Sequence, residues 1–76
     1  MSSEIQLLDF VALTEDLSER GLCRGQVGTV VEVLAQGVFE VEFSDNEGRT
    51  YATLALRADQ VMVLHYEPLE AAPRQP

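Results

Sequence analysis

The sequence predicts an all-β fold, and three observations support this prediction. Residues 38–43 alternate apolar and charged side chains, which is the two-residue period of a strand with one buried face. Residues 27–33 are rich in valine and threonine, the β-branched types that strands favour. Short segments with glycine, aspartate or asparagine separate these runs, as turns do between strands. The pattern is therefore that of strands and not of helices.

Length and composition limit the chain to one small acidic domain. It has 76 residues, of which 46% are apolar, and 13 acidic residues stand against five arginines and no lysine. This apolar share is typical of a globular protein and argues against disorder over the whole length. The net charge of −8 opposes binding to nucleic-acid phosphates, which usually requires a basic surface.

The single cysteine, Cys23, limits both the cross-links and the location that we expect. No internal disulfide can form, and no cluster of cysteine and histidine exists to hold zinc, so we expect no metal and no cofactor. The N-terminus has neither the basic start nor the apolar stretch of a signal peptide. The longest apolar runs, such as Val61 to Leu64, are far shorter than the ~20 residues that cross a bilayer. We expect a cytoplasmic protein that avoids membranes.

Five strands and their turns can be placed along the chain. The strands are predicted at residues 8–14, 26–34, 38–43, 49–56 and 61–66. Ala35 to Gly37 suits a three-residue loop with a left-handed Gly37, and Asp45 to Gly48 suits a four-residue hairpin loop in which glycine supplies a positive φ. Residues 15–25 form a longer polar loop. Arg57 to Gln60 suits one 3₁₀ turn before the last strand.

This order of elements is that of a five-stranded SH3-like small barrel. A strongly bent barrel also protects strand edges that would otherwise be open to unwanted pairing. We therefore expect a flexible N-terminus over residues 1–6, a single SH3-like domain over residues 7–66, and a flexible tail over residues 67–76. The tail contains all three prolines of the chain.

The turns predict a register for the central strands. With a loop at residues 35–37, Leu34 faces Val38, and the next inward pairs are Val33 with Phe39, Val31 with Val41 and Thr29 with Phe43. With a loop at residues 45–48, Ser44 faces Arg49, and the inward pairs are Phe43 with Thr50, Val41 with Ala52 and Phe39 with Leu54. Both turns place the same apolar side of the middle strand inward. A slip of one residue would bring the charged Glu32 beside Val41.

The outer face of this predicted sheet is the candidate binding surface. One row reads Val30, Glu42 and Tyr51, and the next reads Glu32, Glu40 and Thr53. Glu32 and Glu40 then lie directly opposite each other, which is mildly destabilising. A partly apolar platform with these carboxylates would suit a basic protein, and the long loop would add Glu15, Asp16 and Glu19. The alternative is an ordinary solvated sheet face, as antiparallel sheets commonly have.

Motifs for catalysis and for metal binding are weak. The glycines at 21, 25 and 28 lack the spacing and the following helix of a dinucleotide loop, and they fit turns and a strand entry instead. Nothing places Cys23 beside His65 as a nucleophile and its base; we expect a half-buried cysteine and a histidine on the surface or rim. The loop at residues 45–48 is too short for an EF-hand. Phe10, Tyr51 and Tyr66 are too few exposed aromatics for a reader of proline-rich peptides or methylated lysines.

The segment Gly21 to Val33, with Phe39 to Phe43 and Asp45 to Gly48, resembles a bacterial family known as domain of unknown function 4926. The resemblance extends over about Leu7 to Tyr66. It implies a small stand-alone bacterial protein without assigned catalytic residues, in some cases similar to an antitoxin or immunity partner encoded beside a larger protein. Residues 25–30 are also similar to the glycine-centred turn of KOW modules, which bind RNA, although those modules are usually basic.

The combined prediction is a non-catalytic protein-binding module, antitoxin-like or accessory to a larger basic protein. Its predicted docking residues are Glu32, Glu40, Glu42, Tyr51, Thr53, Glu15, Asp16 and Glu19. One alternative is a KOW-like, RNA- or ribosome-associated barrel that uses Arg20, Arg24 and Arg49. Another is a structural domain that pairs with a second copy of itself.

Overall fold

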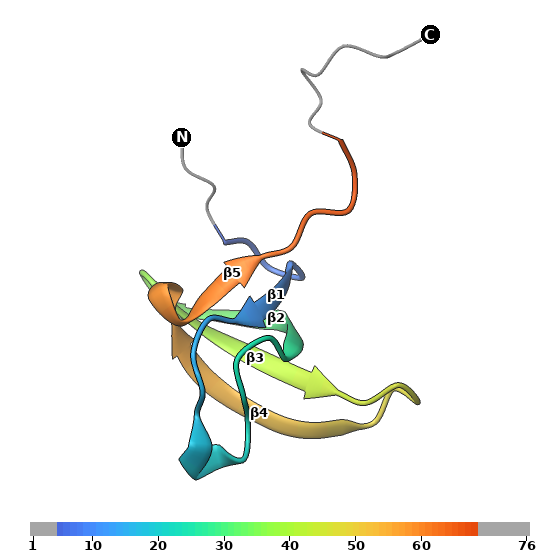
Figure 1. Ribbon diagram of the computed structural model, residues 1–76. Helices are drawn as coiled ribbons and strands as arrows, with labels where there is room; N and C mark the ends of the chain where they lie inside the picture. The colour runs from blue at the N-terminus through green and yellow to red at the C-terminus, as the bar shows by residue number, and fades with distance from the viewer. Residues whose placement is uncertain (1–4, 69–76) are drawn as a thin grey trace, which may run out of the picture.

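The computed structural model describes residues 5–68, which form one antiparallel sheet of five strands (Figure 1). The elements in chain order are β1 (Phe10–Leu13), η1 (Ser18–Arg20), β2 (Val27–Ala35), β3 (Val38–Ser44), β4 (Thr50–Arg57), η2 (Ala58–Gln60) and β5 (Val61–Val63). The strands lie in the order β4-β3-β2-β1-β5. The all-β prediction, the five strands and the 3₁₀ turn before the last strand are confirmed. The sheet is open between β4 and β5, so closure into a barrel is not confirmed.

The first strand is shorter than predicted because a tight turn precedes it. The amide of Gln6 donates to the carboxylate of Asp9 at 2.8 Å, and the amide of Asp9 donates back to the carbonyl of Gln6 at 3.0 Å. Leu8, within this turn, has a φ of +72°, which is unusual for a residue other than glycine. The last strand also ends early, at Val63. Most of the two predicted flexible ends, residues 1–4 and 69–76, lies outside the described residues.

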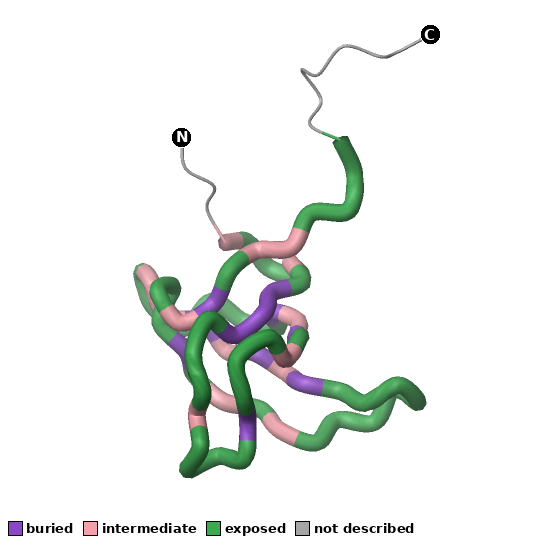
Figure 2. Tube along the Cα trace, viewed as in Figure 1, coloured by how far each residue is buried: buried purple, intermediate pink, exposed green. Residues whose placement is uncertain are grey.

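The core lies between the inner face of the sheet and the long loop. The largest fully buried side chains are Phe43, Leu13, Val11, Val30 and Val41. The loop contributes Leu22, which is buried, and Leu17, which packs against the core while its backbone pairs with that of Leu22. In Figure 2 the buried segments gather around β1 and the middle of β3, whereas the β3–β4 turn is exposed. The long loop therefore covers the inner face of the sheet.

The register between β2 and β3 follows the prediction at one end and departs from it at the other. Val33 lies opposite Phe39, and Glu32 lies opposite Glu40, as predicted. A β-bulge at Val31 then shifts the pairing, so that Val30 and not Val31 lies opposite Val41, and Thr29 lies opposite Glu42 and not Phe43. The predicted place of Val30 on the outer face is wrong, because its side chain is fully buried. The bulge reverses which alternate residues of β2 point inward.

A second shift shortens the loop between β2 and β3. Ala35 pairs with Val38, so the loop has two residues, Gln36 and Gly37, in place of the three expected. The prediction that Leu34 faces Val38 is wrong for this reason. Gly37 has a φ of +77°, as predicted for a left-handed position.

The register between β3 and β4 differs from the prediction by two residues. Phe43 lies opposite Ala52, Val41 opposite Leu54 and Phe39 opposite Leu56. A shift of two residues keeps the same side of β4 inward, so residues 52–56 keep their predicted faces while their partners change. Ser44 lies opposite Thr50 and not Arg49, and Tyr51 is an extra residue in a bulge between the two pairs.

Among the five glycines of the chain, Gly28 alone has atoms within 4 Å of the position that a Cβ would take. A Cβ atom at this position would lie 2.7 Å from Cγ1 of Val41, 2.9 Å from the carbonyl oxygen of Glu42 and 3.1 Å from Cδ2 of Phe43. Because Val41 and Phe43 are fully buried, there is no space for a side chain at Gly28. The strand entry at Gly28 was predicted, but this packing requirement was not.

Candidate interaction surface

Three carboxylates and one threonine share the outer side of β2, β3 and β4, which we call the outer acidic face. These residues are Glu32, Glu40, Glu42 and Thr53. Glu32 lies opposite Glu40, as predicted. Thr53 was predicted opposite Glu40 but lies opposite Glu42, because of the register shift between β3 and β4. An oxygen of the Glu42 carboxylate accepts a hydrogen bond from the Thr50 hydroxyl at 2.8 Å, which fixes its orientation. The central part of the predicted platform is thus present.

The outer acidic face has no cation of its own. Arg49 forms ion pairs with Asp45 and Glu47, and Arg57 forms one with Asp59. Within residues 5–68, no ion pair reaches the three carboxylates of the outer acidic face. The repulsion between Glu32 and Glu40 is therefore not relieved by an ion pair within the described chain.

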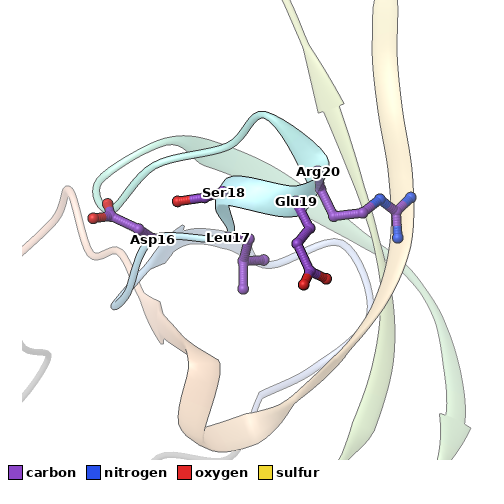
Figure 3. Close-up of a pocket in the computed structure, with 5 residues that line it drawn as sticks. All are labelled: Asp16, Leu17, Ser18, Glu19 and Arg20. Carbon is purple, nitrogen blue, oxygen red and sulfur yellow. The ribbon is translucent and has the colours of Figure 1, made fainter.

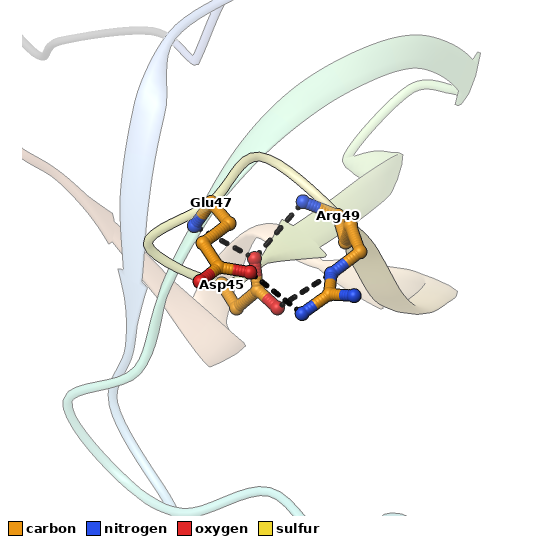
Figure 4. A network of polar contacts seen from close by, with 3 residues as sticks. All are labelled: Asp45, Glu47 and Arg49. Atoms are coloured by element: carbon orange, nitrogen blue, oxygen red, sulfur yellow. Dashed lines mark hydrogen bonds and ion pairs between the residues drawn. The ribbon is translucent and has the colours of Figure 1, made fainter.

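Asp45 has a structural role in the turn between β3 and β4 (Figure 4). One oxygen of its carboxylate accepts hydrogen bonds from the amides of Glu47, at 2.9 Å, and Arg49, at 3.0 Å. These two bonds lower the pKa of Asp45 below its ordinary value of 3.8, and the bond from the Arg49 amide has the larger effect. Gly48 completes the turn with a φ of +84°. The acidic residues of this turn stabilise the hairpin, in agreement with its predicted structural role.

Tyr51 does not join the outer acidic face. The bulge in β4 brings its ring to the inner side, 6.4 Å from the ring centroid of the buried Phe43. Its hydroxyl accepts a hydrogen bond of 2.9 Å from the side-chain amide of Gln26, just before β2. Its predicted position beside Glu42 is therefore wrong. An extra residue in a strand leaves no signal in the alternating pattern that could have revealed this change.

The three acidic residues predicted in the long loop are not brought to the outer acidic face. Glu15 accepts a hydrogen bond from the Gln60 side chain at 3.0 Å, and Asp16 accepts one from the Arg24 amide at 2.9 Å. Glu19 lies with its neighbours around a surface hollow of about 380 Å³, lined by residues 16–20 (Figure 3). Because Leu17 of the same loop packs against the core, these residues lie on the inner side of the sheet. The predicted site thus divides into two separate surfaces.

A group of exposed apolar side chains near β1 was not predicted as part of a site. Phe10 and Val27 are 44% and 48% exposed, and Met62 and Tyr66 are exposed as well. Ala12 pairs with both Val27 and Met62, so three strands contribute to one row. The rings of Phe10 and Tyr66 lie 6.0 Å apart. Exposure of Phe10 was expected from the sequence, but the grouping of these side chains was not, because it depends on the pairing of β1 with β2 and β5.

The two candidate reactive side chains, Cys23 and His65, both lie at the surface. Cys23 is exposed and not half-buried as expected, and His65 is exposed as predicted. Among residues 5–68, no three side chains of histidine, cysteine, aspartate or glutamate cluster as metal ligands do. The same residues contain no helix of the length and hydropathy needed to cross a lipid bilayer.

Comparison with known proteins identifies the family. The model of the domain of unknown function DUF4926 matches residues 7–63. The chain belongs to this family. The matched segment of the DUF4926 domain includes all five strands and the outer acidic face. No curated protein and no solved structure matches the chain.

Proposed function

We propose that this chain is a non-catalytic module that binds a basic protein through the outer acidic face. The observation that carries the proposal is the direct opposition of Glu32 and Glu40 without an ion pair in the described chain. Like charges opposite each other in a sheet cost about 0.2–1 kcal/mol. A cationic side chain of a partner, placed between the two carboxylates, would replace this repulsion with two attractions.

The charge of the whole chain supports the same kind of partner. With a net charge of −8, the domain attracts a basic protein over the screening length of the solution and accelerates their encounter. The partner would be a larger protein for which this domain acts as an antitoxin-like or accessory subunit. Such a role is consistent with the small size of the domain.

The proposal is tested by comparing wild type with the double variant Glu32→Gln/Glu40→Gln. Proteins retained from a lysate of the source organism are identified, and the most enriched basic one is purified and titrated by calorimetry. We expect the double variant to lose about tenfold or more in affinity at low salt, since hydrogen bonds to charged groups contribute at least this much. The control Glu15→Gln/Glu19→Gln removes the same charge from the long loop and should retain binding. Equal affinities for both variants would contradict the proposal.

We also propose that the domain is SH3-like and acts in the cytoplasm. The strand order β4-β3-β2-β1-β5, with η2 between β4 and β5, supports the first part. The exposed thiol of Cys23 supports the second, because a free exposed cysteine suits a reducing compartment.

A further inference from the structure

A groove crosses the outer side of β1, β2 and β3, beside the outer acidic face. Its volume is about 320 Å³, and its lining includes Phe10, Val27, Thr29, Glu42, Ser44 and Asn46. The register explains how these residues meet, since Phe10 lies opposite Thr29, and Thr29 lies opposite Glu42. An aromatic ring and a carboxylate therefore lie on the two sides of a threonine, in one row across three strands.

The two walls of the groove differ in chemistry. Phe10 and Val27 form an apolar wall, and the Phe10 ring is supported by Tyr66 at a centroid distance of 6.0 Å. Glu42 forms the opposite wall, where the Thr50 hydroxyl holds one carboxylate oxygen at 2.8 Å. In the described residues, the other oxygen of Glu42 has no hydrogen-bond donor. The groove thus offers an apolar surface and an oriented anionic acceptor.

A side chain with an aliphatic stem and a cationic head matches both walls. None of the residues that line the groove is cationic, and the carboxylates of Glu40 and Glu32 continue along the same side of the sheet. A purely apolar occupant would leave the second oxygen of the Glu42 carboxylate without a partner, and an anion would be repelled. Arginine fits better than lysine, because its planar guanidinium can stack on an aromatic ring and bind a carboxylate with two parallel hydrogen bonds.

We infer that this groove receives an arginine side chain from an extended segment of the basic partner protein. The stem would lie along Val27, and the guanidinium would stack on the ring of Phe10 and bind Glu42. This inference rests on the proposed function and specifies one contact within it. The neighbouring Glu32 and Glu40 would receive further cations from the same segment.

The test titrates the ¹⁵N-labelled chain at low salt with each of four capped pentapeptides, Gly-Ser-X-Ser-Gly. Binding is measured by the changes in the amide chemical shifts of the chain. X is arginine, lysine, norleucine (stem without charge) or diaminopropionic acid (charge with a short stem). We expect the arginine peptide to shift the amides of Phe10, Val27, Thr29 and Glu42 at the lowest concentration, with lysine next. The norleucine and diaminopropionic acid peptides should produce much smaller shifts at the same residues.

Matched variants separate the two walls. Glu42→Gln should weaken the arginine peptide about tenfold, as expected for loss of a charged acceptor. Phe10→Leu, which keeps the apolar surface but removes the π-system, should weaken it about two- to fivefold. Glu19→Gln carries the same charge change as Glu42→Gln on the long loop and should bind as wild type does. A dispersed spectrum of each free variant verifies that it is folded.

Different failures lead to different conclusions. Equal shifts with norleucine and arginine would overturn the assignment of a cation. Chemical-shift changes confined to Glu32 and Glu40, or no changes with any peptide, would overturn the assignment of the groove as a binding site. The proposed function would then still be decided by the calorimetric test of Glu32→Gln/Glu40→Gln. Groove shifts that depend on the concentration of the free chain would identify a second copy as the occupant and overturn the inference.

Discussion

Replacing Gly28 with alanine is expected to destabilise the fold by overpacking its core. The added Cβ would lie 2.7 Å from a methyl carbon of Val41 and 2.9 Å from the backbone oxygen of Glu42. Ordinary contacts between carbon atoms are about 3.5–4.0 Å. Both Val41 and Phe43 are fully buried, and the backbone of β3 is bonded to strands on both sides, so little relaxation is available.

The size of the effect follows from two opposing contributions. Overpacking of a well-packed core costs about 1–3 kcal/mol. Alanine restricts the unfolded chain more than glycine does, and this raises the free energy of unfolding by about 0.4–1 kcal/mol. The net loss in the free energy of unfolding should be about 1–2 kcal/mol, which lowers Tm by roughly 4–16 °C for a domain of this size.

Urea denaturation followed by circular dichroism measures this loss. Val41→Ala removes the overlapping methyl group, so the double variant Gly28→Ala/Val41→Ala should lose about 1 kcal/mol less than the sum of the single variants. Gly25→Ala is the control, because this glycine has a positive φ of 94° but no atom within 4 Å of its added Cβ. Its cost should add to that of Val41→Ala. If the effects of Gly28→Ala and Val41→Ala are simply additive, the steric reasoning is refuted.

Asp45→Asn should destabilise the hairpin at pH 7 and have less effect at pH 2, as measured by urea unfolding. The folded pKa of Asp45 lies below 3.8, so its ionised form stabilises the fold above about pH 3.8, and this contribution is lost as the pH falls through the folded pKa; an equal effect at both pH values would contradict this. Glu32→Gln should raise the free energy of unfolding by about 0.2–1 kcal/mol at low salt and by less in 1 M salt, and a loss at low salt would refute the repulsion. Leu8→Gly should stabilise the chain by roughly 0.5–1 kcal/mol. A left-handed leucine costs about 1–2 kcal/mol, and the larger entropy that glycine loses on folding offsets part of the relief of this strain. A lower Tm of Leu8→Gly in thermal melts would exclude strain at Leu8.

The sequence was sufficient to predict the elements that depend on alternation and on turn chemistry. The inward side of β3, the left-handed Gly37 and the opposition of Glu32 and Glu40 follow from the two-residue period and from glycine in turns. These features depend on interactions local to one strand or one hairpin. They also define the central part of the candidate surface.

The remainder could not be predicted because bulges change the register without changing the local pattern. Val31 is as apolar and β-branched as Val30, so nothing in the residue types indicates which of them is the extra one. Tyr51 is likewise compatible with either face of β4. The acidic residues of the long loop share their composition with the outer acidic face, but the packing of Leu17 places them on the other side of the sheet. Such positions depend on tertiary contacts.

The bulge at Val31 separates the curvature of β2 from its register with β3. If Val31 were deleted, Val30 would still lie opposite Val41, and Glu32 would still lie opposite Glu40, so the ladder would become continuous without exchanging any of these partners. What such a deletion would remove is the added bend and twist that a bulge gives to its strand. The unpaired Val31 therefore adds bend and twist to β2 independently of which side chains meet across the strands. Variation in chain length at this position would change how deeply the sheet encloses its core while leaving the outer carboxylates in register.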